Sequence, residues 1–262
     1  QAEIAKIEDI LADELKQKAL ISTQLSDIKK KYGQPRRSQI IHMDDVVAYY
    51  AEEEVENYNV KLYLTKEGYF KKITLQSLRG NDEQKCKDGD EILNIMDGEN
   101  TDNLIFLTDQ CQLYRAKADD FDTTKASALG DYLPVTLKMD ADEKPILMNI
   151  QNKYPAKENF VFIFENGKGV RISAANYEIT GNRRKITSAF SKTSPIVAAF
   201  YEKAPMDIML ISSENRAIVI KSSLIPQMST RTSGGVTLMT LKKGQTITRA
   251  ATDLDAIPDG AK

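Results

Sequence analysis

The sequence predicts an all-β, propeller-like fold of four to five blades, preceded by an α-helical segment. A hairpin unit recurs four times, built around tight turns at Gly68, Cys111, Gly167 and Asn215. The turns are 43, 56 and 48 residues apart, and the segments around them are short apolar runs of strand length. A repeat of this length that carries strand pairs is typical of blades stacked around an axis, because one blade cannot bury its faces alone.

The match between the four copies is positional. Apolar residues stand four residues before the turns, at Leu64, Leu107, Ile163 and Ile211, and ten residues after them, at Leu78, Phe121, Tyr177 and Ile225. A cation stands four residues after each of the first three turns, at Lys72, Arg115 and Arg171, whereas the fourth copy has Val219. We therefore expect the four hairpins to bury equivalent side chains.

Residues 1–32 are predicted to form the helix. Apolar residues recur among charged ones in two series with spacings of three and four, at Ile4, Ile7, Leu11, Leu15, Ile21, Leu25, Ile28 and Tyr32. Gly33 should supply a left-handed cap and Pro35 cannot continue a helix, so the helix should end there. Because no capping residue precedes Ala2, we expect the chain to begin inside a longer helix of a larger polypeptide.

Short β-strands are predicted from residue 46 onwards. Their ranges are 46–50, 60–65, 69–75, 92–96, 104–108, 112–117, 146–150, 160–164, 169–173, 196–200, 207–212 and 216–221. A last pair, 236–242 and 245–250, is expected to form a hairpin that turns at Lys243 and Gly244. Polar connections lie between the hairpins, at 79–91, 122–134, 179–195 and 226–235. These connections should carry function, because a rigid β scaffold displays its loops.

Three parts follow from this order: a helical segment with its linker at 1–37, a β domain at 38–252, and a tail at 253–262 that should be flexible. With 262 residues, of which 41% are hydrophobic, the chain can bury a sizeable core. It has no apolar run of about 18 residues and no signal-peptide pattern. We therefore expect a soluble, cytoplasmic protein.

No catalytic residue, metal or cofactor is predicted. Cys86 and Cys111 are the only cysteines, and they form no C-x-x-C pair. The single histidine, His42, cannot build a zinc site without cysteines, and no nucleophile motif such as G-x-S-x-G accompanies it. A Walker loop and a dinucleotide fingerprint are also missing.

Charge is distributed unevenly, although the net charge is only -2. In residues 81–122, twelve acidic residues outnumber four basic ones, a balance of -8. Residues 179–201 carry four cations and no acid, and residues 215–252 carry six cations and no acid. Separated blocks of one sign make a directed field, so the first block should repel phosphate and the later blocks should attract it.

The segment 26–41, SDIKKKYGQPRRSQII, closely resembles the helix end and linker of the A subunit of bacterial DNA gyrase and topoisomerase IV. The signature in that family is a lysine-rich turn, Tyr-Gly, a short polar pair and Arg-Arg. Here these are Lys29 to Tyr32, Gly33, and Arg36 with Arg37.

The resemblance continues through the repeats. LTKEGYFKKITL at 64–75 and LTDQCQLYRAKADDF at 107–121 look like the blade hairpins of that subunit. SSENRAIVIK at 212–221 and GGVTLMTLKKG at 234–244 look similar to its later blades. The resemblance therefore covers nearly the whole chain, and the order of the motifs is more specific than any one of them.

The resemblance implies the C-terminal domain of a type IIA topoisomerase A subunit. Such a domain is a β-pinwheel, whose blades exchange strands and whose rim binds and bends double-stranded DNA without sequence preference. It implies a bacterial, nucleoid-associated protein that is monomeric as an isolated domain and joins the rest of the A subunit and an ATPase B subunit in an A2B2 holoenzyme. The family's cleavage tyrosine follows an arginine, and no Arg-Tyr dipeptide occurs here, so this chain alone should catalyse nothing.

One departure from the family concerns the loop after the first blade. Gyrases carry a glycine-rich basic box there, typically Gln-Arg-Arg-Gly-Gly-Lys-Gly, which they need for wrapping DNA. This chain has LRGNDEQKCKDGD at 78–90, in which acidic residues accompany the remnants Arg79, Gly80, Lys85, Lys87 and Gly89. The degenerate box implies a topoisomerase IV-like domain or a weakly supercoiling gyrase.

The candidate DNA contacts are cations of the basic blocks and of the second hairpin strands: Arg183, Arg184, Lys185, Lys192, Arg231, Lys221, Arg216, Arg171, Lys242, Lys243, Lys71 and Lys72. The loop 182–192 is the first candidate, and its alternative is an ordinary solvated charge run. Arg231 with Gly234 and Gly235 is either a relic of the box, in which backbone amides approach phosphate, or a flexible turn between blades. Alternation places four cations outside, with Arg171 favoured over Arg115 as a DNA contact, and their alternative is a set of charges that protect a sheet edge: Lys71, Lys72, Arg115 and Arg171.

A second hypothesis belongs to another functional class. The chain could be a propeller-like protein-interaction domain whose acidic first half binds a basic partner. DNA binding should respond to changes at Arg183, Arg184 and Lys185, whereas protein binding should respond to the acidic loops.

Overall fold

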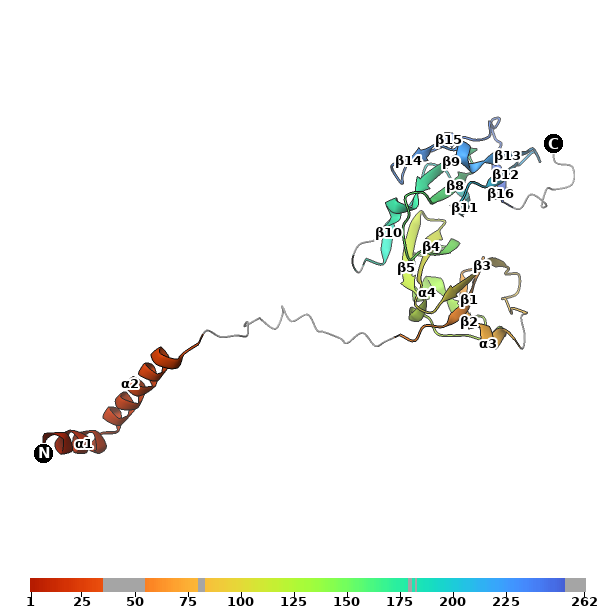
Figure 1. Ribbon diagram of the computed structural model, residues 1–262. Helices are drawn as coiled ribbons and strands as arrows, with labels where there is room; N and C mark the ends of the chain where they lie inside the picture. Colours follow the sequence, from red (N-terminus) through yellow and green to blue (C-terminus); the bar gives the residue numbers. More distant parts are fainter. Residues whose placement is uncertain (35–54, 80–82, 179–180, 182, 253–262) are drawn as a thin grey trace. The chain divides into compact units, whose positions relative to one another are not determined.

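The chain forms two units, a helical one within Gln1–Glu52 and a β unit within Glu53–Lys262 (Figure 1). The computed structural model describes residues 1–34, 55–79, 83–178, 181 and 183–252. The predicted strand 46–50, His42, the Arg36–Arg37 pair, the boundary after residue 37 and the tail 253–262 lie outside the described residues.

The helical unit contains α1 (Ala2–Ala12) and α2 (Glu14–Tyr32) where one helix was predicted. The break lies at Asp13, which is extended and whose side chain accepts a hydrogen bond of 2.9 Å from the Leu15 amide. An aspartate in this position caps a new helix, and the periodicity of apolar residues does not reveal it. Gly33 ends α2 as expected, but with a φ of -63° and therefore without the left-handed cap.

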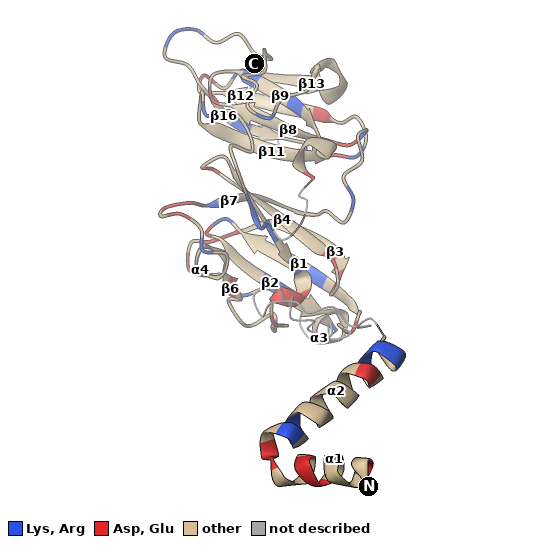
Figure 2. Ribbon diagram, turned by 90° about the vertical axis from the view of Figure 1, so that its left-hand side faces the viewer, with Lys and Arg blue, Asp and Glu red and all other residues tan. Residues whose placement is uncertain are grey.

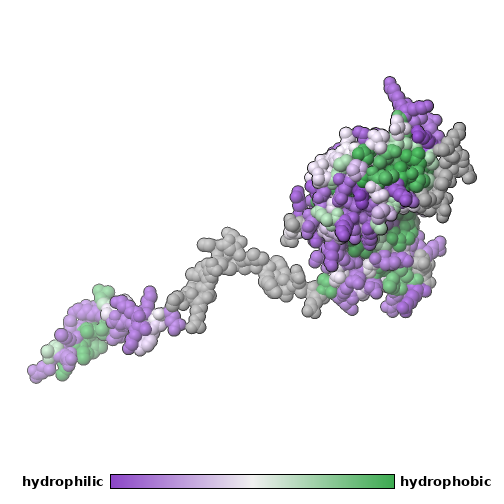
Figure 3. All heavy atoms as spheres, turned by 45° about the horizontal axis from the view of Figure 1, so that its top comes forward, coloured by the Kyte–Doolittle hydropathy of each residue, from purple (hydrophilic) through white to green (hydrophobic). Residues whose placement is uncertain are grey.

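The apolar side chains of this unit are exposed along both helices. Figure 3 shows apolar and polar side chains next to each other on the helical segment, and Figure 2 shows both charge signs on α2. Examples are Leu11 and Leu15, which are 66% and 75% exposed. Neither helix buries a residue.

The β unit consists, over its described residues, of four sheets that we number as blades 1 to 4 (Figures 1 and 2). Blade 1 contains β1 (Asn59–Thr65), β2 (Tyr69–Thr74), β3 (Ile92–Glu99) and β6 (Asp131–Tyr132). Blade 2 contains β4 (Asn103–Thr108), β5 (Gln112–Lys117), β7 (Pro145–Ile150) and β10 (Lys185–Thr187). Blade 3 contains β8 (Asn159–Phe164), β9 (Lys168–Ser173), β11 (Ile196–Glu202), β14 (Gln227–Met228) and β15 (Val236–Thr237). Blade 4 contains β12 (Asp207–Ser212), β13 (Ala217–Lys221) and β16 (Ile247–Ala251).

Short helical turns follow the second strand of each hairpin. They are α3 (Leu75–Leu78), η2 (Ala118–Asp120), η3 (Ala174–Tyr177) and η4 (Ser222–Leu224). A further short helix, α4 (Leu133–Thr136), follows β6. The prediction of four to five propeller-like blades is confirmed, with four.

The four predicted turns are structurally equivalent. Gly68, Cys111, Gly167 and Asn215 have positive φ values of 92°, 59°, 78° and 54°. Each donates its backbone N–H to the carbonyl three residues earlier, over 3.0 to 3.3 Å. A left-handed residue at this place suits glycine and asparagine, and the cysteine of the second copy adopts the same conformation. The register read from the sequence repeat is therefore the register of the fold.

The blades exchange strands, as the family resemblance implied. After the hairpin of blade 2 the chain returns to blade 1, where β6 pairs with β2. After the hairpin of blade 3 it returns to blade 2, where β10 pairs with β5. After the hairpin of blade 4, both β14 and β15 pair with β9 of blade 3. This connectivity is that of a β-pinwheel.

The predicted final hairpin is wrong. β15 pairs with β9 of blade 3, and β16 pairs with β12 on the inner side of blade 4. The exchange strands have only two or three residues each, so they leave no periodic pattern in the sequence.

Two glycines allow the returning chain to approach the preceding blade closely. Gly130 and Gly235 stand directly before β6 and β15, with φ values of 88° and 71°. A Cβ atom at either position would lie 2.2 Å from a backbone oxygen, that of Phe70 or of Gly169. A side chain there would therefore push the exchange strand off its sheet.

Apolar side chains from neighbouring blades share one core. Leu107 and Leu113 of blade 2 belong to the same buried cluster as Phe162 of blade 3 and Phe190, which follows β10. The Phe162 and Phe190 rings stack with centroids 4.8 Å apart. Burial of one such side chain contributes about 1.5–3 kcal/mol. The interfaces between blades are thus as apolar as the blades themselves.

Candidate nucleic-acid interface

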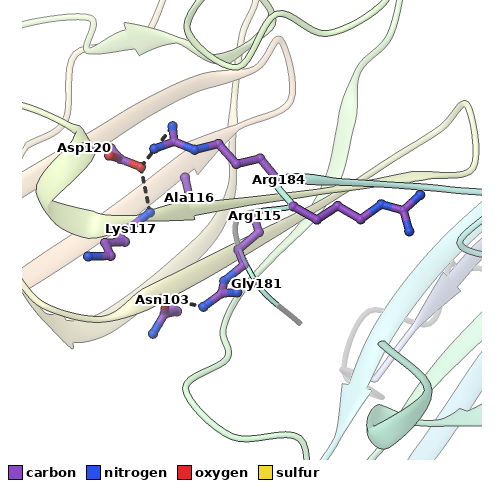
Figure 4. A pocket seen from close by; sticks show the side chains of 8 residues that line it. Asn103, Arg115, Ala116, Lys117, Asp120, Gly181 and Arg184 are labelled. Atoms are coloured by element: carbon purple, nitrogen blue, oxygen red, sulfur yellow. Dashed lines mark hydrogen bonds and ion pairs between the residues drawn. The ribbon is translucent and has the colours of Figure 1, made fainter. Parts of the chain in front are cut away.

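A basic hollow of about 450 Å³ lies on the outer edge of blade 2 (Figure 4). It is lined by Asn103, Arg115, Ala116, Lys117, Asp120, Gly181, Arg183 and Arg184. Four of these residues are cations and one is a carboxylate. The cations come from two segments that are distant in sequence, the strand β5 and the segment that returns from blade 3. Strand exchange therefore creates this concentration of positive charge.

Backbone pairing positions the arginines of the returning segment. The Arg115 amide donates to the Arg184 carbonyl over 2.8 Å, which extends the ladder between β5 and β10 by one residue. Arg115 and Lys117 are two residues apart on β5 and point to the same face. Among its side-chain contacts, Arg115 donates from Nη2 to Asn103 Oδ1 over 3.1 Å. The hollow is thus built on a regular strand rather than on a loop alone.

One ion pair partly neutralises the hollow. Arg184 Nη1 lies 3.6 Å from Asp120 Oδ2, and the Arg184 side chain stays 73% exposed. The same carboxylate accepts the Lys117 amide over 3.0 Å (Figure 4). A pair this exposed contributes little stability and can exchange partners. Arg184 can therefore reach an incoming phosphate.

Sequence analysis missed Lys117 and ranked Arg115 below Arg171 as a DNA contact. Both residues were grouped with the acidic first half of the chain. Their spacing of two on a predicted strand was the signal that places both on one face. Counting charges along the sequence does not reveal this basic hollow. Strand exchange pairs a basic segment, which contains β10, with β5, which belongs to the acidic block of the sequence.

Lys185 was predicted to contact DNA, but it is occupied by protein partners. Its Nζ lies 5.0 Å from the centroid of the Tyr114 ring and 3.1 Å from Asp140 Oδ2. Burial lowers the pKa of Lys185, but hydrogen bonds with Tyr114 and Asp140 outweigh burial and leave the pKa raised. Lys185 therefore holds β10 on blade 2.

A second hollow, of about 410 Å³, lies on the outer edge of blade 3. It is lined by Asn176, Ser188, Ser229, Thr230, Arg231 and Thr232. Arg231 donates from Nη1 to the Asn176 carbonyl over 3.5 Å. The lining offers hydroxyl groups and one guanidinium, which suits phosphate oxygens. Gly235 is needed here for the close approach of β15 to β9, and this packing reason is independent of any ligand.

Lys71 and Lys72 are corrections to the sequence analysis, since both are buried, at 1% and 3% exposure. Lys71 Nζ donates to the Lys85 and Ala126 carbonyls over 2.6 and 3.2 Å. Lys72 Nζ donates to Asn100 Oδ1 and to the Ala118 carbonyl over 2.7 and 2.8 Å. Adjacent residues point to opposite faces of a strand, and here both faces are covered. Neither ammonium group reaches the surface.

Burial lowers the pKa of Lys71 and of Lys72. For Lys72, the nearby carboxylates Asp119, Asp122 and Asp131 oppose this shift. The carbonyl and amide partners stabilise both ammonium groups in the interior.

Arg171 was also expected on the outside, and it is turned inward as well. Its Nε lies 2.6 Å from Oε2 of Glu202, and the two side chains are 19% and 2% exposed. A buried carboxylate needs such a partner. Arg171 is therefore part of the packing of blade 3.

Five other predicted cations are exposed: Lys192, Arg216, Lys221, Lys242 and Lys243. Arg216 directly precedes β13, and Lys221 is its last residue. Lys242 and Lys243 stand in the turn in which the Gln245 amide donates to the Lys242 carbonyl over 3.0 Å. Within the described part of the chain, none of the five forms an ion pair. They leave positive charge displayed on blades 3 and 4.

The degenerate box lies against blade 1. Arg79, Lys87 and Gly89 are exposed, and Gly80 lies outside the described residues. Lys85 joins the loop to the blade, because its amide donates to the Ala126 carbonyl over 3.0 Å.

Acidic side chains in this loop have structural partners as well. Asp90 Oδ1 accepts the Glu67 and Glu91 amides over 3.0 and 2.8 Å. The loop therefore displays a mixture of charges.

In the described ranges, no group of three or more His, Cys, Asp or Glu side chains could hold a metal ion. No helix among them is long and apolar enough to cross a membrane.

Comparison with known proteins identifies relatives for this architecture. A family model described as "DNA gyrase C-terminal domain, beta-propeller" matches residues 207–252, which contain blade 4. The A subunit of DNA gyrase from Clostridium acetobutylicum is 25% identical over 222 residues, covering 82% of this chain and 26% of the relative. Its counterpart from Staphylococcus epidermidis is 21% identical over 252 residues, covering 93% and 28%. The chain spans about a quarter of the length of the curated relatives it matches.

Solved structures share the fold. A crystal structure of the C-terminal domain of DNA topoisomerase IV has a TM-score of 0.65 at 20% identity, covering 75% of this chain and 61% of that one. The ParC C-terminal domain of E. coli has a TM-score of 0.55 at 11% identity, covering 74% and 78%. The resemblance to the C-terminal domain of gyrase and topoisomerase IV A subunits is therefore confirmed.

Proposed function

We propose that this chain is the DNA-binding and DNA-bending domain of a type IIA topoisomerase A subunit and is not catalytic by itself. The basic hollow on blade 2 carries the proposal, because four cations from two segments meet one carboxylate there. Arginine guanidinium groups match the geometry of phosphate oxygens. A hollow on an exposed edge is accessible to a duplex, whereas a buried site is not.

Binding through phosphate implies little sequence preference and a strong dependence on salt. The exposed cations of blades 2 to 4 contact the backbone, and no base-reading element such as a groove-inserted helix is part of the proposal. Each neutralised phosphate contributes about -0.9 to the slope of log affinity against log salt. A duplex seated on several of these cations should therefore show a slope of several units.

Bending follows from the placement of the cations on consecutive blades. Both blade 2 and blade 3 have an arginine-lined hollow on the outer edge, and blade 4 adds exposed cations. Bending a site of 20–30 base pairs by 40–90° costs on the order of 1–6 kcal/mol. Several phosphate contacts along the curve can offset a cost of this size.

The degenerate box supports the weaker form of this activity. The 78–90 loop carries acidic residues where the gyrase box is basic, so the region around blade 1 offers DNA little attraction. We assign the chain to a topoisomerase IV-like enzyme or to a weakly supercoiling gyrase.

The remaining parts of the proposal concern the holoenzyme. The cleavage tyrosine would lie elsewhere in the A subunit, and the ATPase on the B subunit of an A2B2 assembly in the bacterial cytoplasm. The isolated domain should be monomeric. These points rest on the family resemblance.

Charge reversal at the hollow tests the proposal. Arg183→Glu/Arg184→Glu should weaken duplex binding strongly. The slope of log affinity against log salt should become shallower by the amount that about two phosphate contacts contribute. Fluorescence anisotropy with a labelled duplex at several salt concentrations measures both quantities. Lys66→Glu/Lys144→Glu is a matched control, because it reverses the same charge at cations already paired with Glu91 and Glu67.

The outcome separates the two functional classes. Unchanged DNA affinity in the Arg183→Glu/Arg184→Glu variant would reject DNA binding at this hollow and favour the protein-interaction hypothesis. An equal loss in the control variant would mean that net charge alone governs binding, and it would also reject the hollow as the site.

A further inference from the structure

The cation that recurs four residues after the hairpin turns occupies one structural position in three blades. Lys72, Arg115 and Arg171 stand opposite Leu62, Ile105 and Val161 in equivalent registers of their hairpins. A surface role would predict similar exposure in all three. Instead, their partners and their burial differ from blade to blade.

In blade 3 the cation is linked through Glu202, on β11 of the same blade, to the chain that arrives from blade 4. Arg171 Nε donates to Glu202 Oε2 over 2.6 Å, and Asn159 Nδ2 donates to the same oxygen over 2.7 Å. The other oxygen of this buried carboxylate accepts the Ser222 hydroxyl. Ser222 begins η4, and its amide donates to the Met206 carbonyl over 2.8 Å. We call Arg171, Glu202 and Ser222 the blade 3 latch.

In blade 1 the cation reaches the chain that arrives from blade 2. Lys72 Nζ donates to the Ala118 carbonyl over 2.8 Å, and Ala118 begins η2 as Ser222 begins η4. Asn100 is the second acceptor, and it donates in turn to the Glu56 carbonyl over 2.9 Å. We call Lys72, Asn100 and Ala118 the blade 1 latch.

In blade 2 the cation lies beside a different inner-strand residue. In blade 3, Asn159 of β8 pairs with Glu202 of the inner strand β11. At the equivalent place in blade 2, the Asn103 carbonyl accepts the amide of Gln151, which directly follows the inner strand β7. A neutral amide thus replaces the buried carboxylate. Arg115 lines the basic hollow instead.

In blade 4, Val219 takes the position of the cation and is 50% exposed. Within the described residues no exchange strand pairs with β13. In blades 1 and 3 the cation lies where an exchange strand returns, β6 and β14.

We infer that Lys72, directly, and Arg171, through Glu202, are positioning residues that hold the segments returning to blades 1 and 3 against these blades and set the step between consecutive blades. Where the proposed function holds, the same contacts determine the path of bound DNA, although neither residue touches it. Little water reaches these charges, because Lys72 is 3% exposed and Glu202 is 2% exposed. Loss of one partner from a buried pair leaves the other uncompensated.

Hydrogen–deuterium exchange of the full chain without DNA tests the latch directly. Arg171→Gln should increase exchange in residues 222–228 by about tenfold or more, because Glu202, which accepts the Ser222 hydroxyl, loses the cation that positions it. Arg216→Gln, at an exposed cation of blade 4, is the control and should leave exchange in residues 222–228 near that of the parent protein. Arg171→Lys keeps a charged donor for Glu202 and should retain most of the protection, which also covers the case that Arg171→Gln folds poorly.

DNA measurements on Arg171→Gln and Arg115→Gln distinguish positioning from contact. Arg171→Gln should leave the salt slope unchanged and reduce the bend of an end-labelled duplex measured by energy transfer. Arg115→Gln should make the slope shallower by about 0.9. Parental exchange in Arg171→Gln, or a slope reduced by one contact, would overturn the inference. If the parent protein fails to bind DNA, the proposed function fails, whereas the exchange experiment still decides the latch.

Discussion

The outer edges of blades 1 and 2 share one backbone plan and carry opposite charges. In each, an exchange strand from the next blade pairs with the second hairpin strand, β6 with β2 and β10 with β5. The segment that returns to blade 1 brings Asp119, Asp122 and Asp131, whereas the segment that returns to blade 2 brings Arg183 and Arg184. Topology thus sets where the returning segment runs, and its side chains decide what the edge can bind.

The cation beneath each edge follows the same division. Lys72 is buried under the returning segment of blade 1, and Arg115 lines the open hollow of blade 2. The cation of the blade 1 edge is therefore buried, and the carboxylates of the returning segment make this edge acidic. The blade 2 edge is basic on both segments, which makes it the better phosphate site.

The largest difference should appear on removal of the two cations. Lys72→Met leaves the Ala118 carbonyl and Asn100 Oδ1 without their buried donor, and should lower the free energy of unfolding by about 2–4 kcal/mol. Arg115→Met removes a partly exposed side chain and should cost less than about 1 kcal/mol. Urea denaturation followed by circular dichroism measures both. Equal losses would contradict the division between a buried and a surface cation.

A charge transplant should make blade 1 resemble blade 2. Asp122→Lys replaces an exposed carboxylate of the returning segment by an amine, and should increase the salt slope of DNA binding by about one phosphate contact. Duplex titrations at several salt concentrations check this. Asp122→Asn is the matched control, since it removes the negative charge without adding a phosphate ligand and should leave the slope unchanged. A transplant that behaves like this control would mean that DNA never reaches blade 1.

The two edges should also respond oppositely to acid. Burial, with Asp122 nearby, raises the pKa of Asp131 above its ordinary 3.8, although Lys72 opposes the shift. Hydrogen bonds from Gln112 and Lys185 lower the pKa of Asp140 below the same value.

The folded state therefore binds a proton at Asp131 more tightly than the unfolded chain does. Its contribution to stability falls as the pH rises from the ordinary value through the raised native pKa. For Asp140 the contribution is present above the ordinary value and is lost as the pH falls through the lowered native pKa.

The two edges can be compared through the unfolding free energies of Asp131→Asn and Asp140→Asn. These should be measured from about pH 3 to about pH 7, a range that includes the ordinary pKa of an aspartate. Asp131→Asn should gain stability relative to the parent as the pH rises. Asp140→Asn should lose stability relative to the parent over the same rise. Parallel curves for the two variants would show that the carboxylates have similar environments after all.

The smallest effect is expected in the degenerate box. Glu83→Gln/Asp88→Asn removes two exposed carboxylates and should raise DNA affinity only about twofold to threefold at low salt, because exposed charges are screened. The increase should vanish at high salt. Asp207→Asn/Glu214→Gln, at exposed positions of blade 4, is a control for net charge. A gain that persists at high salt would require direct contact with this loop.

Sequence reasoning predicted the hairpins and their register well. The turns at Gly68 and Asn215 repeat one left-handed geometry, and the residues ten positions after the turns, such as Phe121 and Tyr177, are buried as expected. These features are local, so the spacing of residue types records them. The break at Asp13 shows the limit, because a single capping residue outweighed a continuous apolar period.

The candidate site was predicted only in part. Arg183 and Arg184 line the hollow as a basic loop should, but their neighbours on β5 come from the acidic block of the sequence. Lys71 and Lys72 were placed outside because strand alternation says nothing about a blade that is covered on both faces. Both errors arise from strand exchange, which is a long-range pairing of only two or three residues.

The most direct test of DNA binding by the basic edges is the affinity of the full chain for duplex DNA measured against salt concentration. A log–log slope of several units, at about 0.9 per phosphate, is the predicted result. Absence of binding even at low salt would contradict the proposed function, since the hollows on blades 2 and 3 would then have lost any role in holding DNA.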